Sequence, residues 1–151
     1  MEREDETSDE IRLGFIPLTA IKVWVDKAYE RRVWRYDHVG RDEGRLTMLF
    51  ESPDREILDM PDNICVMPDS RLVFVCEDSD YVGAGGTPEN FIRILTPDGR
   101  MADIAKNIVP KFERGEFAGV TFSPDGKTLF FNIQQIGATF AVWGDWDKFN
   151  L

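Results

Sequence analysis

Two segments of the chain are apolar at every position rather than at every second position. Residues 64–67 read Ile-Cys-Val-Met, and residues 73–76 read Val-Phe-Val-Cys. Alternation of apolar and polar residues is typical of a strand with one wet face, whereas continuous apolarity indicates burial on both faces. The pattern therefore predicts two strands of a sheet that lies between two other layers.

Turn sequences divide the rest of the chain into further strands. In Ser123-Pro124-Asp125-Gly126 the proline presets φ for the second position of a type I turn, and glycine suits the fourth. Thr96-Pro97-Asp98-Gly99 repeats that chemistry. The expected strands are 33–37 paired with 45–51, then 62–67 and 72–77; 91–96 paired with 101–105, then 118–123 and 128–134; and a last strand at 139–143.

Two landmarks recur at nearly one spacing. Gly40 and Gly99 are 59 residues apart, and Pro68 and Pro124 are 56 residues apart. Each unit is interpreted as an outer hairpin, an inner strand and a return strand, which is typical of a β-propeller blade. The sequence predicts an all-β fold of antiparallel four-stranded blades, with about two to two and a half blades forming an incomplete ring. Closed propellers have about 4–8 blades, so the ring needs further blades or self-association through its open blade edges.

Charge and composition separate three regions of the 151-residue chain. Residues 1–10 carry six acidic side chains and one arginine, hence −5 of the net charge of −10, and are predicted to be a disordered acidic tail. Residues 11–31 stay unassigned between helix and strand, and residues 32–151 are assigned to the partial propeller. The negative balance disfavours nucleic acid as a partner, and no apolar run reaches the ~20 residues needed to cross a membrane. The start also lacks the features of a signal peptide.

Several residues of types that can react or bind ligands are expected to have structural roles instead. Cys65 and Cys76 lie on two arms of one predicted hairpin, where burial as small apolar residues is favoured over a disulfide. His38, the one histidine, falls in a predicted turn, so exposure is favoured over a catalytic role. The glycine-rich loop 78–89 matches a calcium-binding EF-hand only in part and is interpreted as a connector. The aromatic residues Trp143, Trp146 and Phe149 are expected to pack at the closing strand rather than to form a ligand platform.

Acidic residues at the entrances of the two inner strands are the best candidates for chemistry. Asp62 lies six residues before Pro68, and Glu116 lies eight residues before Pro124. Because these offsets differ by two, strand alternation sends both side chains to one face, near one mouth of the channel. Such a rim could supply the oxygen ligands that calcium requires, although both residues could instead cap loops. Glu77 and Asp78, at the end of a return strand, are further candidates, against simple solvation.

An ordered set of motifs resembles the C-terminal part of PhoX-type alkaline phosphatases. The set is Leu49-Phe-Glu-Ser-Pro-Asp54, Leu58-Asp-Met-Pro-Asp-Asn-Ile64, Cys76-Glu-Asp78, Leu95-Thr-Pro-Asp-Gly99, the segment 116–134 and the ending Thr139-Phe-Ala-Val-Trp-Gly-Asp-Trp146. The resemblance runs from about residue 32 to residue 146. It implies a propeller phosphatase, usually exported, that hydrolyses phosphate esters with calcium and iron at the channel mouth.

The resemblance also assigns metal positions. Asp62 of Pro-Asp-Asn and Glu116 of Glu-Phe-Ala-Gly match acidic metal-site positions of the family, and Glu77 or Asp78 matches less closely. In the family most of the ring, the export signal, the iron-binding cysteine and the phosphate-binding arginines lie upstream of the matched region. The chain is therefore expected to be a C-terminal fragment of a PhoX-like phosphatase that is inactive alone, with a non-catalytic propeller module for binding or assembly as the alternative.

Overall fold

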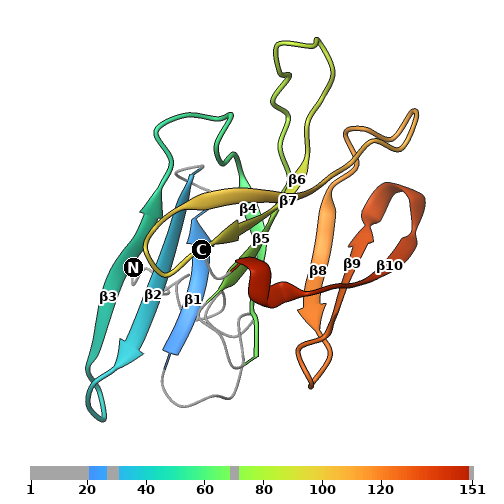
Figure 1. The fold of residues 1–151 in the computed structure, drawn as a ribbon. Helices are drawn as coiled ribbons and strands as arrows, with labels where there is room; N and C mark the ends of the chain where they lie inside the picture. The colour runs from blue at the N-terminus through green and yellow to red at the C-terminus, as the bar shows by residue number, and fades with distance from the viewer. Residues whose placement is uncertain (1–20, 27–30, 69–71, 150–151) are drawn as a thin grey trace, which may run out of the picture.

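The protein is described by a computed structural model over residues 21–26, 31–68 and 72–149. Ten strands form three antiparallel sheets in this part of the chain (Figure 1). The first sheet has the order β1-β2-β3, the second β4-β5-β6-β7 and the third β10-β9-β8. The bounds are β1 Ile21–Asp26, β2 Arg32–His38, β3 Gly44–Glu51, β4 Pro61–Val66, β5 Val73–Glu77, β6 Phe91–Leu95, β7 Met101–Lys106, β8 Phe117–Phe122, β9 Thr128–Ile133 and β10 Ala138–Trp143, with 3-10 turns η1 Gln134–Ile136 and η2 Trp146–Phe149.

The predicted strands all form, and the all-β fold is confirmed. Each predicted pair is antiparallel, including β2 with β3, β4 with β5, β6 with β7 and β8 with β9. The ambiguous segment 11–31 contributes strand β1 at the edge of the first sheet. The predicted acidic tail at residues 1–10 lies outside the described residues.

The grouping of strands into units was wrong. The prediction joined the hairpin of β6 and β7 to the strands that follow it, but β6 pairs with the preceding β5, from Val73↔Leu95 to Cys76↔Ile92. The physical reason is that recurring turns give the length of a repeat without marking where one sheet ends. Within the described residues only the second sheet has four strands, and the other two have three.

The second sheet is covered on both faces, as its continuous apolarity predicted. Every residue of β5 is buried. On one face Val73 and Val75 pack with Val33 and Leu58 from the first sheet and the loop after it. On the other face Phe74 and its neighbours pack with residues of the third sheet. The ring of Phe74 contacts Phe122 and Trp146 edge-on, at 4.9 and 5.8 Å between centroids.

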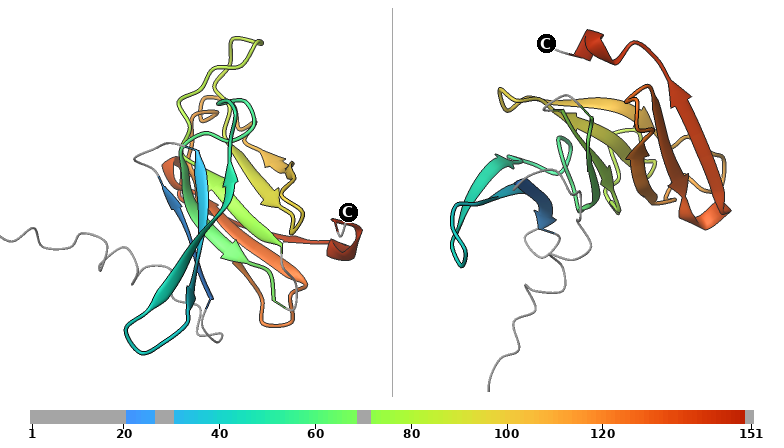
Figure 2. Two further views of the ribbon diagram at one scale, coloured as in Figure 1. Left: turned by 90° about the vertical axis from the view of Figure 1, so that its left-hand side faces the viewer. Right: turned by 90° about the horizontal axis from the view of Figure 1, so that it is seen from below.

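The first strands of the sheets lie side by side. Strand β4 contacts both β1 and β8. Seen from below in Figure 2, the three sheets stand in an open arc, and the described residues do not close a ring. This arrangement is consistent with part of a β-propeller.

The two end sheets each expose apolar side chains. Leu46 and Met48, which are 48% and 44% exposed, lie on the face of the first sheet that points away from Val33. In the third sheet, Phe130 and Trp143 point away from the core and are 36% and 76% exposed. The expectation that Trp143 packs was therefore wrong, because its side chain lies on the face of the third sheet opposite the core, whereas Phe140 of the same strand packs against the core. Trp146 is buried as expected, and the side chain of Phe149 lies outside the described ones.

Both cysteines are free thiols buried in the core, which confirms the prediction. Burial raises the pKa of Cys65 and of Cys76, so both remain protonated at neutral pH. His38 is exposed as predicted, although it ends β2 rather than lying in a turn. Among the described residues no helix is long and apolar enough to cross a membrane.

Candidate metal centre

Three strand ends bring carboxylates together at one end of the sheets. Asp62 is the second residue of β4, Asp78 follows β5, and Glu116 precedes β8. Because β4 and β5 are antiparallel, the start of β4 lies beside the end of β5, with Pro61 opposite Glu77. Strand β8 lies beside β4 and starts at the same end, since Gly119 near its start donates to Asn63 near the start of β4.

The three side chains approach one another closely. One carboxylate oxygen from each of Asp62, Asp78 and Glu116 lies within 4.8 Å of the others. All three side chains are half-buried. Like charges at this separation repel, and the repulsion is offset when a cation lies between them.

Asp62 reaches this position through a β-bulge. Pro61 pairs with Glu77 and Asn63 with Cys76, so Asp62 is the extra residue on β4. A bulge re-aims a side chain and often lies next to a functional site. Simple strand alternation, the basis of the prediction, therefore does not by itself account for the meeting of Asp62 and Glu116.

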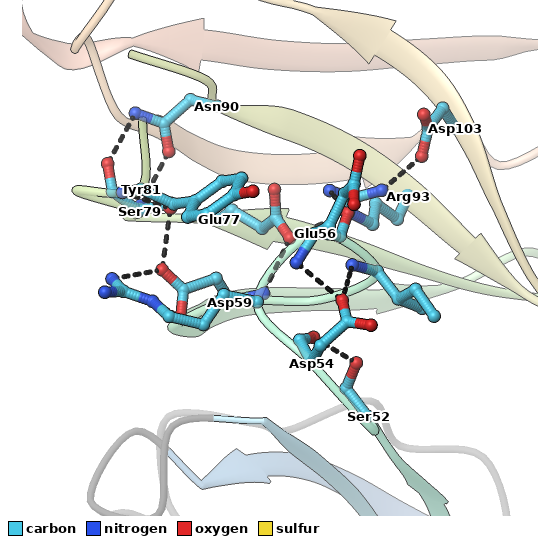
Figure 3. A network of polar contacts seen from close by, with 12 residues as sticks. Ser52, Asp54, Glu56, Asp59, Glu77, Ser79, Tyr81, Asn90, Arg93 and Asp103 are labelled. Atoms are coloured by element: carbon cyan, nitrogen blue, oxygen red, sulfur yellow. Dashed lines mark hydrogen bonds and ion pairs between the residues drawn. The ribbon is translucent and has the colours of Figure 1, made fainter. Parts of the chain in front are cut away.

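Polar contacts hold the backbone at Asp78 and at Ser79, and Figure 3 shows those of Ser79 with Asp59 and Asn90. The N–H of Asp78 donates to the carbonyl oxygen of Met60 at 3.1 Å. Beyond it, Ser79 donates through its hydroxyl to Asp59 at 2.7 Å and through its N–H to Asn90 Oδ1 at 2.7 Å. These contacts fix the chain at Asp78 and at the residue that follows it.

Glu77 is not brought together with the other three carboxylates. Its side chain points to the opposite face of the sheet and accepts a hydrogen bond from Arg93 Nε at 2.7 Å and one from the N–H of Asp59 at 2.9 Å. Glu77 and Arg93 are both buried, with side-chain exposures of 1% and 5%. Arg93 also bonds to Asp103 and to the carbonyl oxygen of Glu56. Burial raises the pKa of Glu77 to about 7, against the opposing charge of Arg93.

The network around Arg93 was missed in the sequence. A signal was present, because Arg93 is the single charged residue of the otherwise apolar strand β6, Phe91–Leu95. A charge inside a buried strand requires a partner of opposite sign. Glu77, at the end of the neighbouring strand, provides it.

Two amide side chains beside the site have partners within the protein. Asn63 Oδ1 accepts a hydrogen bond from the N–H of Gly119 at 3.1 Å, and therefore links β4 to β8. Gln134 Nε2 donates to Glu116 Oε1 at 3.0 Å.

The chemistry of the donor set suits a hard divalent cation. Carboxylate oxygens are the ligands that calcium prefers, and calcium takes about 6–8 oxygen ligands from protein and water together. The cluster contains no histidine or cysteine. Cys76 is nearby, but burial and the neighbouring carboxylates raise its pKa, which opposes the thiolate form that a metal binds. The residues therefore fit calcium, and they offer iron only oxygen ligands.

Comparison with protein families matches residues 20–137 to the family described as alkaline phosphatase PhoX. The match covers most of the chain and all but the last of its ten described strands. No curated protein and no solved structure matches the chain.

Proposed function

Because the chain belongs to the PhoX alkaline phosphatase family, we propose that Asp62, Asp78 and Glu116 hold a calcium ion at a phosphatase site. The observation that carries the proposal is the meeting of three carboxylates from three separate strand ends. Sheet structure alone does not require such a concentration of negative charge, and the family is one of metal-dependent phosphatases. The substrate class is phosphate monoesters.

A bound divalent cation would neutralise phosphate charge and activate the attacking group. The residues of the chain hold and orient that cation. Asp78 is fixed by the hydrogen bond of its own N–H and by the contacts of Ser79, and Asp62 is aimed by the bulge in β4. Three carboxylates supply only part of a calcium coordination sphere, so we expect the chain by itself to bind calcium without hydrolysing phosphate esters. A role for iron is implied only by the family to which the chain belongs.

Calcium is expected to stabilise the chain against heat. A ligand that binds only the folded state adds about 2.7 kcal/mol of stability when its concentration is 100 times Kd. The midpoint of thermal unfolding, followed by circular dichroism, should rise with calcium concentration and return to its starting value after chelation. Potassium chloride at equal ionic strength serves as the control. An unfolding midpoint that calcium moves no further than potassium does would contradict the proposal.

The second candidate function is assembly, which the open apolar faces of the end sheets favour. The end sheets expose apolar side chains, as a face does that another sheet would normally cover. They are Leu46 and Met48 on the first sheet, and Phe130 and Trp143 on the third. Two copies of three sheets would give six, within the range of about 4–8 blades of closed propellers. Light scattering should then report a dimer in the absence of metal. A monomer at all concentrations, together with calcium binding, would favour the first candidate.

A further inference from the structure

Glu116 is held at three points by two consecutive glutamines. Gln134 Nε2 donates to the carboxylate oxygen Oε1 of Glu116 at 3.0 Å. The N–H of Glu116 donates to Gln135 Oε1 at 2.8 Å. The N–H of Gln134 donates to the carbonyl oxygen of Glu116 at 3.1 Å. Backbone donor, backbone acceptor and side chain of one residue are thus all fixed from one short segment.

The local fold explains how both glutamines reach Glu116. They begin the 3-10 turn η1, which directly follows β9, and β9 ends opposite the start of β8. The turn ends at Gly137, whose φ of 60° lies in the left-handed region that favours glycine. Because β9 pairs with β8 up to Phe117↔Ile133, the turn lies next to the residue that precedes Phe117, which is Glu116.

The chemistry of an amide suits the task of holding a metal ligand. An amide N–H fixes the orientation of a carboxylate, but it adds no positive charge that would compete with a cation, as lysine or arginine would. In metal sites the residues that orient the ligands contribute to metal affinity, and replacing one of them typically lowers that affinity about 10–100-fold.

A second contact links the strands that lie next to two of the proposed ligands. Gly119, with φ of 63°, lies in the bulge of β8, between Ala118 and Thr121. The bulge leaves its N–H to donate to Asn63 Oδ1, next to Asp62. The strand that carries Asp62 is therefore tied to the strand that follows Glu116.

We infer that Gln134 and Gln135 form a clasp that positions the Glu116 carboxylate for the cation. Gln134 acts on the carboxylate and Gln135 on the backbone, so both are positioning residues that act through Glu116. This inference rests on the proposed calcium site.

The test is a double-mutant cycle on calcium affinity, measured by isothermal titration calorimetry of the 151-residue chain. Gln134→Leu should weaken calcium binding about 10-fold or more. In the Glu116→Gln background the same substitution should have almost no further effect, because the carboxylate that it orients is gone. Asn132→Leu is the matched control. It removes another hydrogen bond from a side-chain amide of β9 to β8, the one to the carbonyl oxygen of Ala118, and should leave the calcium affinity within about twofold of that of the parent.

A measurement without metal tests the clasp independently. Hydrogen exchange by NMR should show the backbone N–H of Glu116 protected in the parent and unprotected in Gln135→Ala, while the protection of β5 amides stays unchanged.

The outcomes separate the two proposals. If the parent binds calcium and Gln134→Leu binds it equally well, the clasp is overturned and the calcium site stands. If Gln134→Leu lowers the affinity equally in the parent and in the Glu116→Gln background, the clasp is overturned too, because Gln134 would then act elsewhere. If the parent shows no calcium binding, the proposed function falls, and the role of the clasp in metal binding falls with it.

Discussion

Replacing Arg93 with methionine is expected to destabilise the folded chain by about 3–5 kcal/mol, the range found when one partner of a buried ion pair is removed. The side chain of Arg93 is 5% exposed and pairs with Glu77, which is 1% exposed. Methionine fills much of the same volume, but it leaves the Glu77 carboxylate buried without its counter-charge. Urea unfolding, followed by tryptophan fluorescence, measures the loss.

The loss should also depend on pH. Burial raises the pKa of Glu77 to about 7, and removing the positive charge of Arg93 should raise it further. An acid whose pKa is higher in the folded than in the unfolded state binds more protons when folded, so stability falls as pH rises between the two values. Arg93→Met should therefore be less destabilised at pH 5 than at pH 8.

An exposed ion pair provides the control for this prediction. Arg100 donates to Asp98 at 2.7 Å, with both side chains about half exposed. Solvent screens surface pairs, so they contribute little to stability, and Arg100→Met should cost little at either pH. If Arg93→Met and Arg100→Met cost the same, the buried pair does not stabilise the second sheet as described.

The double variant Asp62→Asn, Glu116→Gln is expected to abolish calcium binding and to leave the metal-free chain as stable as the parent or more so. The two effects have one cause, because carboxylate oxygens within 4.8 Å bind a cation together and repel one another without it. Neutral amides remove the repulsion along with most of the attraction for the cation. Thermal unfolding with and without calcium measures both effects on the same samples.

The control changes the net charge equally at exposed positions. Asp42→Asn, Asp145→Asn removes two carboxylates outside the cluster and should keep the full calcium response. If this variant loses the response as well, calcium acts through overall charge. If calcium raises the unfolding midpoint of the Asp62→Asn, Glu116→Gln variant as much as that of the parent, the ion binds elsewhere.

Apolar patterning and turn chemistry were sufficient to predict nine of the ten described strands, and β1 was left unassigned. Residues 64–67 and 73–76 predicted a sheet buried on both faces, and β5 is completely buried. The grouping of strands was not predictable in the same way, because sheet membership depends on which strand β6 pairs with, and the apolar pattern of β6 does not specify that partner.

The composition of the candidate site was also only partly predictable from the sequence. Glu77 and Asp78 are adjacent in sequence, and their side chains point to opposite faces, one to Arg93 and one to Asp62. Which of the two joins Asp62 depends on the bulge that makes Asp62 an extra residue in β4, and no residue type in that segment requires a bulge. The clasp was also unpredictable, since it depends on how the turn after β9 approaches Glu116.

The most direct test of the central claim is a crystal structure of the chain grown with calcium. We expect a calcium ion about 2.3–2.6 Å from one oxygen each of Asp62, Asp78 and Glu116, with water completing its coordination. Its anomalous signal at long wavelength would identify it. Crystals saturated with calcium in which these carboxylates bind no ion, or in which they lie apart, would contradict the account.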